Sequence, residues 1–163
     1  MKVRKATLKD FEEIMKIYEW ARGFMKETGN PTQWGEAYPS REMISDDIKK
    51  EYLYVVEDEG AVVCVFYFRI GEDESYKEIF EGDWINDKEY GVVHRIAAKP
   101  GKSYGGFALD WCFEECGNVR IDTHKDNIPM QRLLKKKGYT YCGIIYIKEY
   151  GERIAFQKTA CIK

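Results

Sequence analysis

Both histidines of the 163-residue chain, His94 and His124, fall in the single stretch from Val92 to His124. An imidazole titrates near neutral pH, so either side chain could take a proton from a reacting group. Asp122 stands two residues before His124, on the same face of a predicted strand, where a carboxylate would tune the histidine. These residues indicate acid–base chemistry. The alternative is that they hold the strand end in place by hydrogen bonds.

A glycine-bearing turn lies between the two histidines. It reads GKSYGG at 101–106 and precedes an amphipathic segment. Glycine tolerates a left-handed backbone and lets a ligand approach closely, and the first turn of a helix presents unpaired N–H groups. The turn is therefore suited to a phosphate. On the glycines alone, a bare connection without a ligand is the alternative.

Hydrophobic periods define the elements that must position these residues. Alternating and β-branched runs predict strands at residues 2–6, 52–57, 61–70, 92–98, a run ending at 122–124, 139–147 and 154–159. Periods of three and four residues predict helices from the Thr7 capping box to Gly29, over 41–50 after Ser40, after the glycine turn, and from Asp126 or Asn127 to Gly138. Because side chains alternate along a strand, His94 and Arg95 are expected on opposite faces.

The composition argues against several classes of protein. The length suits one domain, residues 1–163, with a single core. A net charge of −2, from 26 basic and 28 acidic residues that are well mixed, gives no footprint for nucleic acid. The N-terminus lacks a secretory signal, and no run of about 18 apolar residues predicts a membrane span. We expect a cytoplasmic protein with neither a nucleic-acid nor a membrane partner.

Five cysteines form an odd set: Cys64, Cys112, Cys116, Cys142 and Cys161. Cys112 and Cys116 are one helical turn apart and could share a metal ion. No second pair of Cys or His has a matching spacing, so the prediction is small buried hydrophobic side chains and no metal site.

Three motifs in register carry a resemblance to a known family. They are HRIAA at 94–98, GKSYGG at 101–106 and RIDTHKDNIPMQRLLKKKGY at 120–139. Together with the order of elements they resemble the GCN5-related N-acetyltransferases (GNAT) over nearly the whole chain. The resemblance implies an α+β fold. Its mixed, mostly antiparallel twisted sheet would have about seven strands, a V-shaped splay between strands 4 and 5, and about four flanking helices.

The resemblance also implies a site for acetyl-CoA. The pantetheine arm would pair with the strand at Ile96, Ala97 and Ala98, whose N–H groups are the natural oxyanion donors. The glycine turn would hold the pyrophosphate, and Asn127 would contact the CoA arm, with a simple N-cap as its alternative. The residues of the turn are Gly101, Lys102, Ser103, Tyr104, Gly105 and Gly106.

Two positions depart from the family pattern. Pro100 and Ser103 stand where the phosphate turn usually has a Gln or Arg and a glycine. Backbone N–H groups hold most of a pyrophosphate, so the anion site should survive. Leu134 stands where the family often has a tyrosine suited to protonating the leaving thiolate, so the usual general acid is absent.

The predicted function is acetyl-CoA-dependent transfer of an acetyl group directly to a primary amine of a small molecule or peptide. No cysteine falls on the cleft strands to carry the acetyl group covalently. His124, His94 and Asp122 are the candidates for moving the proton. The rival is a non-catalytic acyl-CoA-binding or sensor module.

The acceptor is not named by any motif. Trp34, Tyr38, Trp84 and Tyr90 could wall its pocket, with ordinary packing as the alternative. Carboxylates between Glu72 and Glu81 would suit a cation, but such runs are commonly solvated surface. The aromatic content is compatible with a homodimer.

Overall fold

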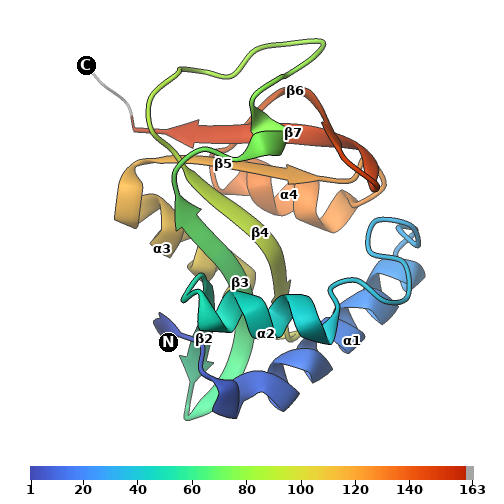
Figure 1. Cartoon of the computed structure of the whole chain (residues 1–163), viewed down its shortest axis with the longest axis vertical. Coiled ribbons are helices and arrows are strands. Elements are labelled where there is room, and N and C mark those ends of the chain that lie inside the picture. The colour runs from blue at the N-terminus through green and yellow to red at the C-terminus, as the bar shows by residue number, and fades with distance from the viewer. Residues whose placement is uncertain (161–163) are drawn as a thin grey trace.

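A seven-stranded sheet in the order β1-β2-β3-β4-β5-β7-β6 forms the centre of the molecule (Figure 1). The strands are β1 (Lys2–Lys5), β2 (Leu53–Asp58), β3 (Ala61–Ile70), β4 (Gly91–Ala98), β5 (Asn118–Thr123), β6 (Thr140–Ile147) and β7 (Gly151–Thr159). Neighbours are antiparallel except β4 and β5, which are parallel. This computed structural model describes residues 1–160, so Cys161 lies outside the described part.

Helices cover both faces of the sheet (Figure 1). They are α1 (Phe11–Glu27), α2 (Arg41–Lys49), α3 (Tyr104–Cys116) and α4 (Ile128–Lys136), with 3-10 turns at Leu8–Asp10 and Glu74–Tyr76. Apolar side chains of α1 and α2 pack on one face, and those of α3 and α4 pack on the other. The fold expected from the resemblance is therefore confirmed.

Three helices begin at the caps that the sequence predicts. The Asp10 carboxylate accepts the Thr7 N–H at 2.8 Å ahead of α1. The Ser40 hydroxyl accepts the Met43 N–H at 3.1 Å, and the Asn127 amide oxygen accepts the Met130 N–H at 3.2 Å. Each bond satisfies an N–H group that the first turn would otherwise leave unpaired. The caps thus fix where α2 and α4 start, and the Thr7–Asp10 box starts the 3-10 turn that leads into α1.

The cysteines occupy apolar positions. Cys64 and Cys112 are fully buried in the core beneath α3, and the Cys116 thiol donates to the Cys112 carbonyl at 3.4 Å within that helix. Burial raises the pKa of the Cys64 thiol to about 12, so it stays a protonated, unreactive side chain. These positions fit the packing role expected of them.

Within residues 1–160, no helix combines the length and apolar content that crossing a bilayer requires.

The outer edge strand β6 exposes Tyr141 and Tyr146, and the Phe80 ring lies 5.4 Å from Tyr146. The homodimer stays a prediction.

Candidate active site

A cleft opens where β4 and β5 separate. The two strands pair only from Gly91 to Val93 on β4. Beyond that point, two adjoining hollows lie along the free edge of β4. The turn-side hollow, about 190 Å³, is bounded by the end of β4, the start of α3 and α4. The His94 cavity, about 280 Å³, contains His94 and Asp122.

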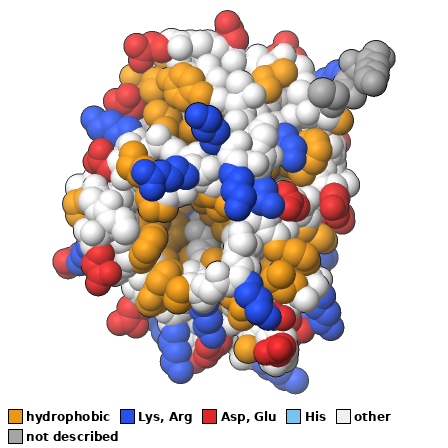
Figure 2. Space-filling model, turned by 180° about the vertical axis from the view of Figure 1, so that it is seen from behind, with side chains coloured by type: hydrophobic (Ala, Val, Ile, Leu, Met, Phe, Trp, Pro, Cys, Tyr) orange, Lys and Arg blue, Asp and Glu red, His pale blue; other side chains and the backbone are white. Residues whose placement is uncertain are grey.

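The two hollows form one continuous cleft. Met25, Ile96, Asn127 and Met130 line both of them. Figure 2 shows a hollow in the face opposite the Figure 1 view, with apolar side chains in its walls and Lys and Arg side chains around it. The expected splay between strands 4 and 5 is therefore a real opening in the surface.

Arg95 interrupts the pleat of β4. Tyr67 pairs with His94 but Val65 pairs with Ala97, so Arg95 and Ile96 together oppose a single residue of β3. The φ of Arg95 is +51°, in the left-handed region. This extra residue is a β-bulge, and a bulge breaks the alternation of side chains.

As a result, His94 and Arg95 lie on the same side of the sheet, and the expectation that they would point to opposite faces is wrong. Both line the His94 cavity. The Tyr67 ring lies 5.5 Å from the His94 ring and 4.7 Å from the Arg95 guanidinium carbon. The bulge thus adds a cation to the wall of the cavity.

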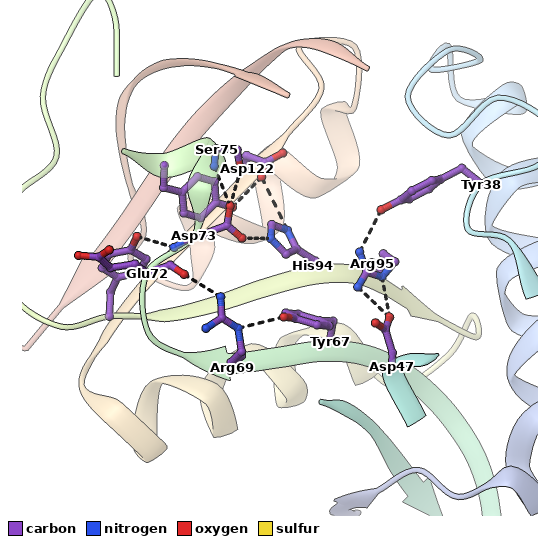
Figure 3. Close-up of polar contacts among 12 residues, drawn as sticks. Tyr38, Asp47, Tyr67, Arg69, Glu72, Asp73, Ser75, His94, Arg95 and Asp122 are labelled. Carbon is purple, nitrogen blue, oxygen red and sulfur yellow. Dashed lines mark hydrogen bonds and ion pairs between the residues drawn. The ribbon is translucent and has the colours of Figure 1, made fainter. Parts of the chain in front are cut away.

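Side chains from α1, from α2 and from the loop between them hold the bulge. The buried Tyr18 hydroxyl donates to the Arg95 carbonyl at 2.7 Å. The Arg95 guanidinium donates to Asp47 at 2.7 and 3.0 Å and to the Tyr38 hydroxyl at 3.2 Å (Figure 3). A non-glycine residue in the left-handed region costs about 1 kcal/mol or more, and these bonds offset that cost.

For the acetyl transfer that the resemblance implies, Tyr18→Phe should lower kcat several-fold and leave the KM for acetyl-CoA nearly unchanged. It leaves the Arg95 carbonyl without its partner, which costs about 1–3 kcal/mol, and frees the bulge beside His94. Steady-state kinetics and urea unfolding measure the two effects. Tyr139→Phe is the matched control, since the buried Tyr139 hydroxyl has no partner within residues 1–160. If both variants retain wild-type kcat, the bulge does not depend on Tyr18.

His94 lies between two carboxylates (Figure 3). Its Nε2 is 2.7 Å from an Asp73 carboxylate oxygen, and its Nδ1 is 4.0 Å from an Asp122 carboxylate oxygen. The Tyr76 hydroxyl donates to that same Asp122 oxygen at 2.6 Å. This network assigns the proton of a neutral imidazole to Nε2, so Nδ1, 4.0 Å from Asp122, keeps an unprotonated lone pair.

The two carboxylates have opposite pKa shifts. Burial would raise the pKa of Asp73, but hydrogen bonds from His94 and Ser75 outweigh it and hold that pKa well below its usual value. Burial raises the pKa of Asp122, and the nearby His94 and Arg153 only partly offset this. Asp73 is therefore a firmly ionised acceptor that orients the imidazole, while Asp122 accepts a proton more readily.

The Asp73 shift predicts a pH-dependent stability difference. The folded pKa of Asp73 lies below its unfolded value near ~3.9, so its stabilising effect is complete above that value and is lost as pH falls towards the folded pKa. Asp73→Asn should therefore lower the free energy of unfolding at pH 7 and lower it less at pH 3. Urea denaturation of both proteins measures this. An equal difference at the two pH values would contradict it.

The glycine turn is shaped for an anion. Gly101 and Ser103 have φ values of +133° and +37°, and α3 starts at Tyr104. The first bond of the helix runs from the Phe107 N–H to the Ser103 carbonyl, so the N–H groups of residues 104–106 precede the helical ladder. A Cβ on Gly105 would touch only Leu133, at 3.5 Å. These backbone groups fit a phosphate.

The other residues predicted for the cofactor have mixed positions. Ile96, Ala97, Ala98 and Asn127 line the turn-side hollow. The Lys102 amine and the Tyr104 hydroxyl instead bond to Asp58, at 3.3 and 3.2 Å. The Asn127 amide N–H₂ donates to Gln33 at 2.9 Å, so its side chain caps α4 and also holds the loop after α1.

Several predicted site residues lie outside the His94 cavity. Trp34 and Tyr38 do line this cavity. Trp84 and Tyr90 instead pack against the Arg120 guanidinium, whose carbon lies 4.2 and 4.0 Å from their ring centroids. His124 lies in a separate hollow of about 160 Å³. Its Nδ1 accepts the Asp126 N–H at 3.0 Å, and burial lowers its pKa. Asp122 and His124 therefore do not form the pair that their spacing indicated.

Sequence reasoning did not single out three residues of the site. Asp73 was covered only as one of the carboxylates between Glu72 and Glu81, and Arg153 lies on β7, between β5 and β6. Lys137 bonds to Asp110 at 2.7 Å and lies over the start of α3, where a Cβ on Gly106 would come within 2.8 Å of it. Leu134, by contrast, is fully buried in the core. None of the three missed residues has a local motif that would have revealed it.

Comparisons with known proteins bear on the fold and the family of the chain. No protein-family model matches the chain, and no curated protein matches it. A solved GNAT-family acetyltransferase from Streptococcus agalactiae 2603 is 33% identical, with a TM-score of 0.90 over 99% of this chain and 96% of that chain. A putative acetyltransferase from Staphylococcus aureus Mu50 is 22% identical, with a TM-score of 0.68 over 98% and 99% of the two chains.

A third solved structure shares the fold at lower identity. YncA of Salmonella typhimurium, a putative acetyltransferase solved with its cofactor acetyl-CoA, is 14% identical, with a TM-score of 0.62 over 99% of this chain and 95% of that chain. Fold and cleft together define the acetyltransferase class. At the identity and coverage of the Streptococcus protein, the chain belongs to the GNAT family.

Proposed function

We propose that this protein transfers an acetyl group from acetyl-CoA to a primary amine, with His94 as the general base. The observation that carries the proposal is the imidazole that Asp73 holds at 2.7 Å in the cavity where β4 leaves β5. A base must lie within hydrogen-bond reach of the proton that it removes, and this cavity gives an amine that access.

Acetyl-CoA fits the cleft as a co-substrate that supplies the acetyl group. The free edge of β4 from Ile96 to Ala98 offers backbone groups to an extended amide chain. The N–H groups at the start of α3 would hold its phosphates, with the ammonium of Lys137, which is paired with Asp110 at 2.7 Å, as a nearby positive charge. The Ser103 N–H is bonded to the Gly101 carbonyl at 3.0 Å, so the N–H groups of residues 104–106 are the proposed phosphate donors.

The proton route follows from the hydrogen bonds. An alkylamine has a pKa near ~10 and enters as the ammonium ion, which the Asp122 carboxylate stabilises. His94 Nδ1 accepts a proton, directly or through water, while Asp73 stabilises the resulting imidazolium. The amine nitrogen then bonds to the acetyl carbon as the carbon–sulfur bond breaks, and the second proton that the nitrogen loses on becoming an amide leaves through water in the cleft.

The absence of a tyrosine at Leu134 does not block this reaction. A thiol has a pKa near ~8.5, so the thiolate of CoA can depart without first receiving a proton. The proton that His94 has taken is then available to it through the cleft. The rival, a module that only binds acyl-CoA, has no need of an oriented imidazole with a free Nδ1.

The test is release of free CoA from acetyl-CoA in the presence of a panel of amines, followed with a thiol reagent. Acceptor-dependent release, with the acetylated amine identified by mass spectrometry, supports the proposal. Tight binding of acetyl-CoA by calorimetry together with silence across the panel would favour the rival.

A further inference from the structure

Three ionisable side chains form a row across one face of the sheet. His94 lies on β4, Asp122 on β5 and Arg153 on β7. Asp122 pairs with Ala155, so Arg153, two residues before Ala155, lies on the same face and diagonally next to Asp122. All three line the same cavity of about 280 Å³. The row therefore runs from the proposed base to a cation at the far side.

Arg153 forms no close ion pair within residues 1–160, although the charge of Asp122, which lines the same cavity, acts to raise its pKa. Its side chain donates only to main-chain carbonyls, those of Tyr150, Glu152 and Gln33, at 3.1, 2.9 and 3.1 Å. No carboxylate within residues 1–160 lies within the 4.0 Å of an ion pair. A guanidinium has five N–H donors, so two remain unused.

Burial of the Arg153 guanidinium without a close ion pair costs free energy. Arg153 is only 5% exposed, and burial lowers its pKa. A buried cation is costly unless an anion pairs with it. By contrast, the neighbouring Arg95 is bonded to Asp47 through two of its nitrogens. Of the two guanidinium groups in the cavity wall, Arg153 is the one with capacity for an incoming anion.

The space beyond Arg153 is also rich in donors. A second hollow of about 160 Å³ shares Tyr150 and Arg153 with the His94 cavity, and His124 and Lys125 line it against the single carboxylate of Glu152. Because His124 Nδ1 accepts the Asp126 N–H, its Nε2 carries the hydrogen and lies 3.5 Å from the Thr32 hydroxyl oxygen. A negative group at this end of the acceptor would meet the donor side chains of Arg153 and Lys125.

Resting on the proposed function, we infer that the acceptor is a small amino carboxylate, such as a free amino acid. Its amine lies at His94 and Asp122, and its carboxylate binds Arg153. Its apolar part packs against Trp34, Tyr38 and Tyr150, which line the same cavity. Arginine binds a carboxylate through two parallel hydrogen bonds, which fixes the orientation of the acceptor as well as its affinity.

The size of the cavity agrees with a small acceptor. About 280 Å³ lies just below the usual range for drug-sized ligands and suits a molecule the size of an amino acid. The N-terminal residue of a peptide has an amide where a free amino acid has its carboxylate. Arg153 would therefore select free amino acids against peptide N-termini.

The inference is tested with acceptors that differ only in the carboxylate. Phenylalanine is compared with 2-phenylethylamine, and leucine with 3-methylbutylamine, by kcat/KM for CoA release. A hydrogen-bonded charge pair predicts that the amino acid of each pair is preferred by about 10- to 100-fold. If the wild-type protein uses the simple amines equally well or better, the inference is wrong while the proposed acetyl transfer stands.

Arg153→Met should bring the ratio of kcat/KM between amino acid and amine close to one. Arg153→Lys, which keeps the charge but loses the paired hydrogen bonds, should give an intermediate ratio and serves if Arg153→Met does not fold. Lys158→Met is the matched control, because Lys158 is on the same strand but lies over the Phe113 ring, outside the cavity. A ratio that survives both Arg153 variants would overturn the inference. Silence with every acceptor would overturn the proposed function as well.

Discussion

His94→Gln should lower kcat by about 100- to 10,000-fold, the usual contribution of a general base. Glutamine can still donate a hydrogen bond towards Asp73, but it has no basic nitrogen to accept a proton. Because His94 lies outside the turn-side hollow, acetyl-CoA should bind with nearly wild-type affinity. Single-turnover kinetics and calorimetry separate these two quantities.

His124→Gln is the natural control, since His124 was the other histidine that the sequence nominated. It lies in the hollow beyond Arg153 and its Nδ1 is already bonded to the backbone. Its kcat should stay far closer to the wild-type value than that of His94→Gln. The opposite pattern would transfer the role of base to His124.

The sequence was sufficient to predict where helices start but not the bulge in β4. The helix starts at Thr7, Ser40 and Asn127 were predictable because a capping side chain acts within three residues of itself. The β4 bulge was not, because a left-handed Arg95 is stabilised by Tyr18 and Asp47, which are distant in sequence. Without the bulge, strand alternation gives the wrong face for Arg95.

The contact between Asp73 and His94 also could not be predicted from the sequence, because Asp73 comes from an irregular segment. Asp73 lies in the 71–90 segment, where charge gives no period and reads as solvated surface. Its contact with His94 depends on the turn at Glu74–Tyr76 and on the docking of Tyr76 against Asp122. Trp84, from the same segment, looked equally suited to a pocket but packs on Arg120. Tertiary contacts, not composition, decide between such residues.

The three glycines of the turn are required for different physical reasons. Gly101 needs its positive φ of +133°, and a Cβ on Gly106 would come within 2.8 Å of the Lys137 side chain. Gly105 has neither constraint, since its φ is not positive and a Cβ there would make only an ordinary contact with Leu133 at 3.5 Å. Gly105 does line the turn-side hollow. Close approach of a ligand is therefore the remaining reason for glycine at 105.

Gly105→Val should raise the Kd for acetyl-CoA by at least about 10-fold, because its methyl groups would occupy the space in front of the free N–H groups of α3. The melting temperature should change little, since a Cβ at this position would make only an ordinary contact with Leu133. Gly23→Val in α1 is the matched control, because a Cβ there meets nothing within 4 Å. If Gly105→Val binds acetyl-CoA as the wild type does, the phosphates lie elsewhere. If binding is lost, the turn is the anchor from which the cleft directs the acetyl group towards His94.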